Sequence, residues 1–366
     1  MNKETLLIVI DNLKKGGAEI LLVGILPDLQ KKFDVVLVTL TDDCDFKDEE
    51  ICCKKKYILG FRNKSQLITS ALRLKKIIRQ NRPSLIHSHL YYSSLIARIA
   101  CPSHIPLIYC LHGEMSKNVF NNSRVLTFLE KKTIKRNHAV MAVSNGVLTD
   151  YENCIGKNNL SFVLKNYILD VFFSEKHFKR DYENLQKLNL IAVGNIKKAK
   201  NYSYLIKAFS CLKHLRVFLD VYGNGHEADL NMLKNDVEKN NLSISFKGAT
   251  DNIYEQLGNY DLYVSCSSHE GFGMAVVEAM ASGLPLLLSD LPVFHEITVD
   301  NALFFDSADP ASFVKLIHQI IERKFDLDKL CKQGIEIAKR YTKEIYLDNL
   351  FNIYQSILHP PVINND

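Results

Sequence analysis

The sequence predicts an α/β protein with two Rossmann-like domains and a cleft between them. Short apolar runs alternate with amphipathic segments along nearly the whole chain, which is typical of parallel sheets covered by helices on both faces. A length of 366 residues is enough for two domains of ordinary size. The polar, broken segment 170–185, with Phe172 and Phe173 near its start, predicts a linker between the two series.

In the first half, runs rich in Leu, Ile and Val predict the strands. Their expected positions are 5–10, 33–40, 84–87, 107–111, 139–143 and 161–165. A helix is expected at 18–29. Another is expected at 66–80, where Leu67, Ala71, Leu74 and Ile78 recur at helical spacing. We expect the first domain to span 1–168.

The second half repeats the alternation, beginning with a strand that ends on a glycine, Gly194. Its expected strands are 188–193, 217–222, 242–246, 262–266 and 284–288. Expected helices are 202–212, 274–281, 310–323, 328–340 and 342–358. These positions define a second domain at 169–342 and a C-terminal helical segment at 343–366.

Composition favours a soluble globular protein in the cytoplasm. Hydrophobic residues make up 47% and charged residues 24%. No apolar run approaches the roughly 20 residues of a membrane span. The N-terminal residues lead directly into a strand, so no cleavable signal is expected.

Charge is distributed unevenly between the two halves. Residues 1–168 carry 25 Lys and Arg against 15 Asp and Glu, whereas the remainder carries 21 against 26. Basic clusters lie at 54–56, 73–82 and 131–136. This asymmetry favours an anionic partner for the first half, either an anionic acceptor or an anionic membrane surface. The alternative is that these charges are solvated faces that serve only solubility.

The nine cysteines and twelve histidines predict neither disulfides nor a metal site. The cysteines are scattered without a C-x-x-C spacing, as expected for reduced thiols that fill the core. No H-E-x-x-H motif occurs, and the acidic residues at 42–45 belong to a loop that is expected to be solvated. We therefore expect no metal and no cofactor.

The most informative segment is 267–285, which predicts a strand, a glycine-rich loop and a helix. Glu270 lies in the loop beside Gly271, Phe272 and Gly273, and Glu278 lies two turns into the helix that starts at Met274. The first amides of such a helix have no partners in the chain and face whatever occupies the loop. A helical glutamate is most often solvated, but Glu278 has apolar neighbours and needs a hydrogen-bond partner. The two carboxylates are therefore placed to hold two ends of a polyol.

Two further loops and one histidine are candidates for the same site. The basic loop 194–201 follows a predicted strand directly, where open α/β sheets bind ligands, and a lysine there can neutralise a diphosphate. Gly16-Gly17 joins the first strand to the first helix, either as a tight turn or to let backbone approach a ligand. His112 ends the predicted strand 107–111 and is expected to point into the cleft, with His87 and His89 as alternatives.

This set of motifs resembles the retaining glycosyltransferases of the GT-B fold, family 4 (group 1 glycosyltransferases). The resemblance extends over nearly the whole chain and rests mainly on residues 248–296, with 194–200 and Gly16-Gly17 adding to it. It implies a C-terminal helix that crosses back to the first domain. It also implies metal-independent transfer of a sugar, with retention of its anomeric configuration, from a nucleoside diphosphate sugar.

The resemblance also implies roles for individual residues. The implied catalytic residues are Glu270, Lys200 and His112. The implied donor-binding residues are Gly17, Asn195, Gly271, Phe272, Gly273, Met274 and Glu278. Asn195 departs from the family pattern, because an arginine is usual at this position and an asparagine brings no charge.

We therefore expect a hexosyltransferase that uses a nucleotide-sugar donor, with UDP-sugars favoured by the resemblance. The expected acceptor is an anionic lipid-linked oligosaccharide or surface polysaccharide at the inner face of a bacterial membrane, and nucleic acid is not an expected partner. Two alternatives remain. One is a catalytically inactive nucleotide-sugar-binding subunit, favoured by Asn195, and the other is a GT-B sugar-nucleotide epimerase.

Overall fold

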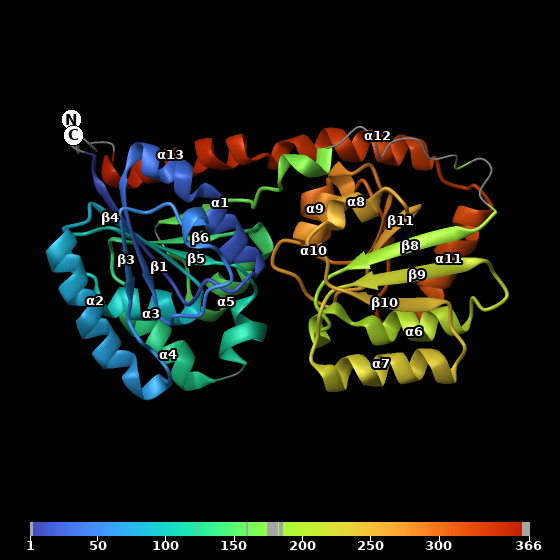
Figure 1. Ribbon diagram of the computed structural model, residues 1–366, viewed down its shortest axis with the longest axis horizontal. Helices are drawn as coiled ribbons and strands as arrows, with labels where there is room; N and C mark the ends of the chain where they lie inside the picture. The colour runs from blue at the N-terminus through green and yellow to red at the C-terminus, as the bar shows by residue number, and fades with distance from the viewer. Residues whose placement is uncertain (1–2, 122, 159, 174–181, 183–185, 361–366) are drawn as a thin grey trace. The chain divides into compact units, whose positions relative to one another are not determined.

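The computed structural model describes residues 3–121, 123–158, 160–173, 182 and 186–360. The chain divides into two compact units, of which the first contains the residues up to Asn166 and those from Tyr346 onward. The second unit is Tyr167–Ile345. Each unit is built on one parallel sheet with helices on both faces (Figure 1). The predicted α/β class and the return of the C-terminal helix to the first unit are confirmed.

The first unit has a seven-stranded sheet in the order β3-β2-β1-β4-β5-β6-β7. Its strands are β1 (Thr5–Ile10), β2 (Asp34–Thr39), β3 (Lys55–Ile58), β4 (Leu85–His89), β5 (Leu107–Leu111), β6 (His138–Ala142) and β7 (Ser161–Val163). Strand β3 was not expected from the sequence, because its lysines lack the apolar alternation of a strand. Among the described strands it pairs with β2 alone and forms an edge of the sheet, where charged side chains discourage pairing with another chain.

Helices cover both faces of this sheet, with α1 and α13 on one side and α2, α3 and α4 on the other (Figure 1). Their bounds are α1 (Gly17–Lys32), α2 (Leu67–Asn81), α3 (Tyr91–Ala100), α4 (Arg124–Thr133), α5 (Asn145–Ile155) and α13 (Lys343–Leu358). The ring of Tyr354 in α13 is fully buried and meets Phe33 edge-on at 5.8 Å. Burial of this aromatic side chain attaches α13 to the first unit.

The second unit has a six-stranded sheet in the order β10-β9-β8-β11-β12-β13. Its strands are β8 (Leu188–Val193), β9 (Val217–Tyr222), β10 (Ile244–Gly248), β11 (Leu262–Ser265), β12 (Leu286–Ser289) and β13 (Leu303–Phe305). Its helices are α6 (Tyr202–Ser210), α7 (Glu227–Lys239), α8 (Ile253–Leu257), α9 (Met274–Ala281), α10 (Pro292–Thr298), α11 (Pro310–Ile321) and α12 (Leu327–Ala338). The short strand β13 was not predicted, since three residues are too few for a periodic signal.

Strand order determines where a site can form in the second unit. Strand β8 lies between β9 and β11. The connection that follows β8 leads to β9 on one side, whereas the connection that follows β11 leads to β12 on the other side. The loops after β8 and β11 therefore emerge next to each other at the carboxyl edge of the sheet, where open α/β sheets bind ligands. These are the loops that carry Lys200 and Glu270.

The predicted linker at 170–185 is wrong for its first residues. Asp170–Phe173 forms a short 3₁₀ helix, and Phe172 is buried with its ring 6.4 Å from that of Tyr254. The Ser282 hydroxyl donates to the Phe172 carbonyl at 3.2 Å. Phe172 therefore packs into the second unit although the segment around it in the sequence is polar. Most of the remaining segment lies outside the described residues.

Candidate functional site

Lys200 and Glu270 form an ion pair at the carboxyl edge of the second sheet. The Lys200 ammonium nitrogen lies 2.7 Å from Glu270 Oε2, and both side chains are about one-fifth exposed, at 23% and 21%. A backbone hydrogen bond from Ser268 to Ala199, at 2.8 Å, holds their two loops together. The structure thus unites two residues that are 70 positions apart, and a charged pair at this depth remains reachable by a ligand.

Two glycines make room for this pair. Gly194 has a φ of +154°, and a Cβ added there would lie 2.8 Å from Lys200 Cε. Gly223, with a φ of +150°, lies so close to Gly194 that an added Cβ would be 2.2 Å from the Gly194 carbonyl oxygen. A side chain at Gly194 would therefore displace Lys200, and one at Gly223 would displace the loop itself.

Glu278 lies on α9, and the pKa of its carboxyl group is raised. Burial raises the pKa of its carboxyl group from 4.5 to about 7, and the positive charge of Lys200 opposes this shift. Among the described residues no hydrogen bond satisfies this carboxylate. A ligand that offers hydroxyl donors would supply the missing partners.

The start of α9 offers backbone amides beside these side chains. Gly273 caps the helix with a φ of +94°, and a Cβ there would lie 3.0 Å from the Phe294 ring. The side chain of Phe272 is buried and packs edge-on against Tyr341 at 5.6 Å, which fixes the loop. Met274 is the first residue of the helix, so its amide has no intrahelical acceptor. The backbone here can therefore meet an anion or a sugar hydroxyl.

Asn195 lies exposed on the loop after β8, as do Lys197 and Lys198. Lys200 is the residue of this loop that takes part in the ion pair, and it ends the short 3₁₀ helix Lys198–Lys200. Lys197 and Lys198 are the candidates to compensate for the charge that Asn195 lacks.

His112 belongs to a histidine cluster in the first unit. It follows β5 directly, and its Nε2 lies 3.2 Å from Nδ1 of His89, the last residue of β4. Burial lowers the pKa of His112 to about 4, and burial and the nearby His112 lower that of His87 to about 3. The cluster is therefore neutral at physiological pH, and His112 can donate or accept a hydrogen bond without carrying charge. The sequence singled out all three histidines but not their contacts.

The glycine pair at the start of α1 is open on one side. A Cβ on Gly17 would meet nothing within 4 Å, whereas one on Gly16 would lie 2.5 Å from Glu19 Oε2. A side chain at Gly16 would displace only the flexible end of Glu19, while Gly17 leaves space above the helix N-terminus. The sequence predicted either a tight turn or a close approach of a ligand at Gly16-Gly17, and the open space at Gly17 is compatible with a ligand.

A cavity of about 230 Å³ opens next to His112 in the first unit. Its lining combines His112 and Gly113 with residues of α3 and α4, among them Tyr91, Arg98 and Glu130. These α3 and α4 residues could not be predicted from the sequence, because a helical side chain carries no local signal of the cavity that it lines.

Sequence reasoning also missed two supporting residues. Ser267 is fully buried, with its hydroxyl 3.4 Å from Glu270 Oε2. The buried Tyr202 donates its hydroxyl to the Gly194 carbonyl at 2.8 Å. Ser267 adjoins the motif and could have been noticed, but Tyr202 resembles any core tyrosine of a helix.

Comparisons with known proteins agree with this arrangement. The profile described as Glycosyl transferases group 1 matches residues 173–341, and that of Glycosyltransferase Family 4 matches residues 15–165. The chain is similar to the putative glycosyltransferase EpsF of Bacillus subtilis, at 24% identity over 79% of this chain and 80% of the relative. It is also similar to the O-antigen biosynthesis glycosyltransferase WclY of Escherichia coli, at 25% identity over 45% of each chain.

Solved structures share the fold across both units. HepE of Anabaena in complex with UDP has a TM-score of 0.82 at 18% identity, covering 96% of this chain and 100% of its own. The lipopolysaccharide outer core galactosyltransferase WaaB has a TM-score of 0.76 at 13% identity, covering 96% and 99%. Each unit thus has the parallel α/β fold found in GT-B structures.

Proposed function

The chain belongs to the group 1 glycosyltransferases of GT-B family 4, and from this premise we propose that it is a retaining hexosyltransferase with a nucleoside diphosphate sugar as donor. UDP-sugars are the favoured donors, since UDP occupies the similar structure of HepE. The proposed acceptor is a hydroxyl group of a lipid-linked or surface glycan, in line with the names of WclY and WaaB.

The observation that carries this proposal is the grouping of Lys200, Glu270 and Glu278 at one edge of the second sheet. A cation 2.7 Å from a carboxylate, beside the first amides of α9, suits a diphosphate joined to a sugar. The unpartnered Glu278 suits the two ribose hydroxyls of the nucleotide. Glu270 and the amides from Gly271 to Gly273 would hold the sugar.

Transfer then needs little covalent chemistry from the protein. The bond between the anomeric carbon and the diphosphate oxygen breaks as the acceptor hydroxyl forms a bond to the same face of the sugar. The acceptor proton passes to the departing diphosphate, whose charge Lys200 stabilises, helped by Asn195. His112 orients the sugar as a neutral donor or acceptor, and the proposed transfer is metal-independent.

The site makes a direct prediction for nucleotide binding. A thermal-shift and calorimetric screen against UDP, GDP, ADP, CMP and their sugar conjugates should show selective stabilisation by one nucleotide. At a ligand concentration of 100 times Kd the gain is about 2.7 kcal/mol. We expect Glu278→Gln to lose this gain, because an amide accepts ribose hydroxyls less strongly than a carboxylate. A folded protein that responds to none of these nucleotides would refute the proposed donor site.

The same variant provides its own folding control through pH. Because the pKa of Glu278 is raised in the folded protein, the folded chain binds this proton more tightly than the unfolded chain. Ionisation of the buried Glu278 lowers the free energy of unfolding. This loss is absent at low pH, grows as the pH rises above about 4.5 and is complete above about 7. Glu278→Gln should therefore be more stable than the wild type at pH 8, by up to about 3 kcal/mol, and similar at pH 4.5. Loss of both stability and binding at pH 8 would indicate misfolding.

We also propose that the first unit docks on an anionic membrane. The attachment that we propose is peripheral. No helix among the described residues has both the length and the apolarity needed to cross a bilayer. Helix α4 exposes Val125 and Phe128, at 67% and 59%, and Lys132 lies over the Phe128 ring at 5.7 Å. Exposed apolar side chains flanked by lysines match an interfacial anchor.

This attachment can be measured with vesicles. Phe128→Ser combined with Lys131→Gln and Lys132→Gln should lower partitioning onto anionic vesicles by at least tenfold, since each surface lysine contributes about 1 kcal/mol. Partitioning of the wild type should fall with salt. The matched control is Phe218→Ser, which removes an aromatic ring of similar exposure, 42%, from the second unit. The proposal would be contradicted if partitioning did not depend on salt concentration, or if Phe218→Ser lowered partitioning as much as the α4 variant does.

A second candidate function is a nucleotide-sugar-binding subunit without turnover. Asn195 favours it, because the exposed loop presents an amide where an arginine is usual. Donor binding with no transfer to any lipid-linked or glycan acceptor, and none restored by Asn195→Arg, would support this candidate over the enzyme. NMR of the donor alone would reveal an epimerase.

A further inference from the structure

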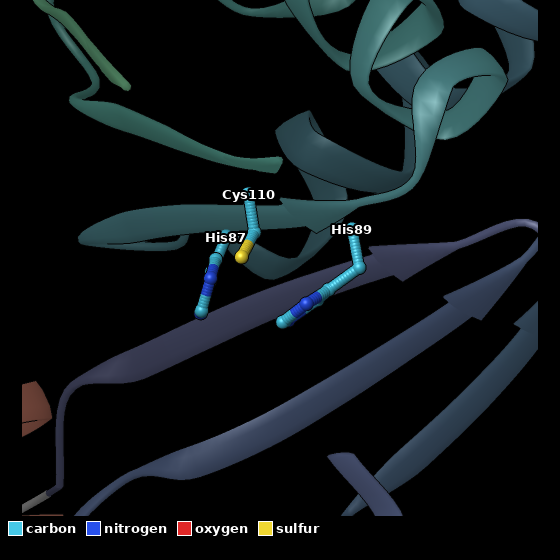
Figure 2. A group of neighbouring side chains, drawn as sticks. All are labelled: His87, His89 and Cys110. Atoms are coloured by element: carbon cyan, nitrogen blue, oxygen red, sulfur yellow. The ribbon is translucent and has the colours of Figure 1, made fainter. Parts of the chain in front are cut away.

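The tertiary structure gathers two histidines and a cysteine inside the first unit (Figure 2). His87 and His89 alternate along β4, so both side chains leave the same face of the sheet. Cys110 is the register partner of His89 on the neighbouring strand β5. One ligand atom from each of the three lies within 4.8 Å of the others, and all three residues are buried. The 20 residues between His89 and Cys110 hide this grouping in the sequence.

The hydrogen bonds of the two histidines leave one nitrogen on each without a partner. His87 Nδ1 lies 2.6 Å from the Tyr354 hydroxyl, and His89 Nδ1 lies 3.2 Å from His112 Nε2. Both Nε2 atoms are buried and lack a partner among the described residues. Most buried polar atoms in proteins form hydrogen bonds, and a buried atom without a partner destabilises the fold. Two such atoms in a cluster that also contains a thiol call for a shared partner.

We propose that His87, His89 and Cys110 bind a thiophilic divalent cation, with Zn²⁺ as the expected ion. Two imidazole nitrogens and one thiolate are ligands that zinc prefers, and three protein ligands leave one position for water. Typical bonds of about 2.0–2.1 Å to nitrogen and about 2.3 Å to sulfur require the side chains to close by little more than about 1 Å. Small side-chain rotations suffice for this.

The surrounding contacts already resemble an outer shell for a metal. Ligating histidines usually donate their second ring N–H to a protein group, which fixes the tautomer. Here the His87 N–H would be donated to the Tyr354 oxygen and the His89 N–H to His112 Nε2. On binding, the zinc–sulfur bond forms while the Cys110 thiol releases its proton to solvent, and both imidazoles bind as neutral groups.

The proposed role of this ion is structural and separate from sugar transfer. Tyr354 belongs to α13, whereas the three ligands belong to β4 and β5. An ion held by His87 would tie the first sheet to α13 through the Tyr354 contact. Metal loading should therefore protect the amide hydrogens of α13 and of β4 and β5 from exchange, and should not alter those of α9.

The test uses Co²⁺ as a spectroscopic substitute for Zn²⁺ on the whole, chelator-treated protein. One equivalent of Co²⁺ should produce a thiolate-to-cobalt charge-transfer band, which Zn²⁺ then removes by competition. Cys110→Ser should abolish this band. The matched control is Cys101→Ser, which removes another buried thiol of the same unit and should keep the band.

X-ray absorption at the zinc edge of the wild type needs no variant, so it decides the question even where Cys110→Ser fails to fold. One sulfur and two imidazole nitrogens are expected. A folded wild type without the cobalt band would overturn the proposal. The two Nε2 atoms would then be hydrogen-bonded to buried water. A shell with no sulfur, or with two sulfurs as from Cys52 and Cys53, would overturn it equally. None of these readouts depends on transferase activity.

Discussion

Lys200→Ala and Glu270→Ala are each expected to lower turnover of the sugar donor by at least about 10²–10³-fold, or about 3–4 kcal/mol of transition-state stabilisation. Lys200 is the cation positioned to meet charge that develops on the departing diphosphate. Glu270 holds Lys200 at 2.7 Å before the donor arrives and would hold the sugar afterwards. Each group acts where charge or geometry changes during transfer, so kcat should fall more than affinity.

The two variants should differ in how they bind UDP alone. Lys200→Ala removes the cation and should weaken UDP binding, whereas Glu270→Ala leaves Lys200 unpaired and should bind UDP at least as well as the wild type. Calorimetry measures the affinity, and single-turnover assays with the preferred nucleotide sugar measure the transfer. Lys207→Ala is the matched control, because it removes an exposed lysine of the following helix α6. Near-normal turnover in either variant would refute the role assigned to that residue.

Arg98→Met is expected to destabilise the first unit by about 3–5 kcal/mol. Arg98 and Glu130 form an ion pair between α3 and α4, with side chains 1% and 0% exposed. Tyr151 donates its hydroxyl to the other Glu130 oxygen at 2.8 Å, and the Arg98 Nε donates to Thr133 at 3.1 Å. Loss of Arg98 would strand a buried carboxylate, which costs more than the pair itself contributes.

A double-mutant cycle separates this cause from simple loss of packing. Glu130→Leu should also be strongly destabilising, but Arg98→Met with Glu130→Leu should recover part of the loss because no charge stays buried alone. Chemical denaturation at pH 7 measures all four proteins. Strictly additive effects would contradict the idea that the uncompensated charge is responsible. Arg79→Met, on the exposed face of α2, should change stability by less than about 0.5 kcal/mol.

Most of the fold could be predicted because its signals are local. Apolar runs such as Thr5–Ile10 and Leu188–Val193 are buried on both faces of a parallel sheet, so each is visible without knowledge of its neighbours. Strands β3 and β13 were missed because one lies at a charged edge and the other has three residues. The 3₁₀ helix at Asp170–Phe173 was taken for linker because its partners, Tyr254 and Ser282, are distant in sequence.

The sequence alone determined the α/β class, the two units, the family and the two motifs that carry Lys200, Glu270 and Glu278. Each of these depends on residue type at short spacing along the chain. Only the tertiary structure decided which side chains meet. The Lys200–Glu270 pair, the burial that raises the pKa of Glu278 and the joining of His87, His89 and Cys110 depend on strand order and register. These long-range contacts are made by strand pairing and core burial, which bring residues together independently of their separation in sequence.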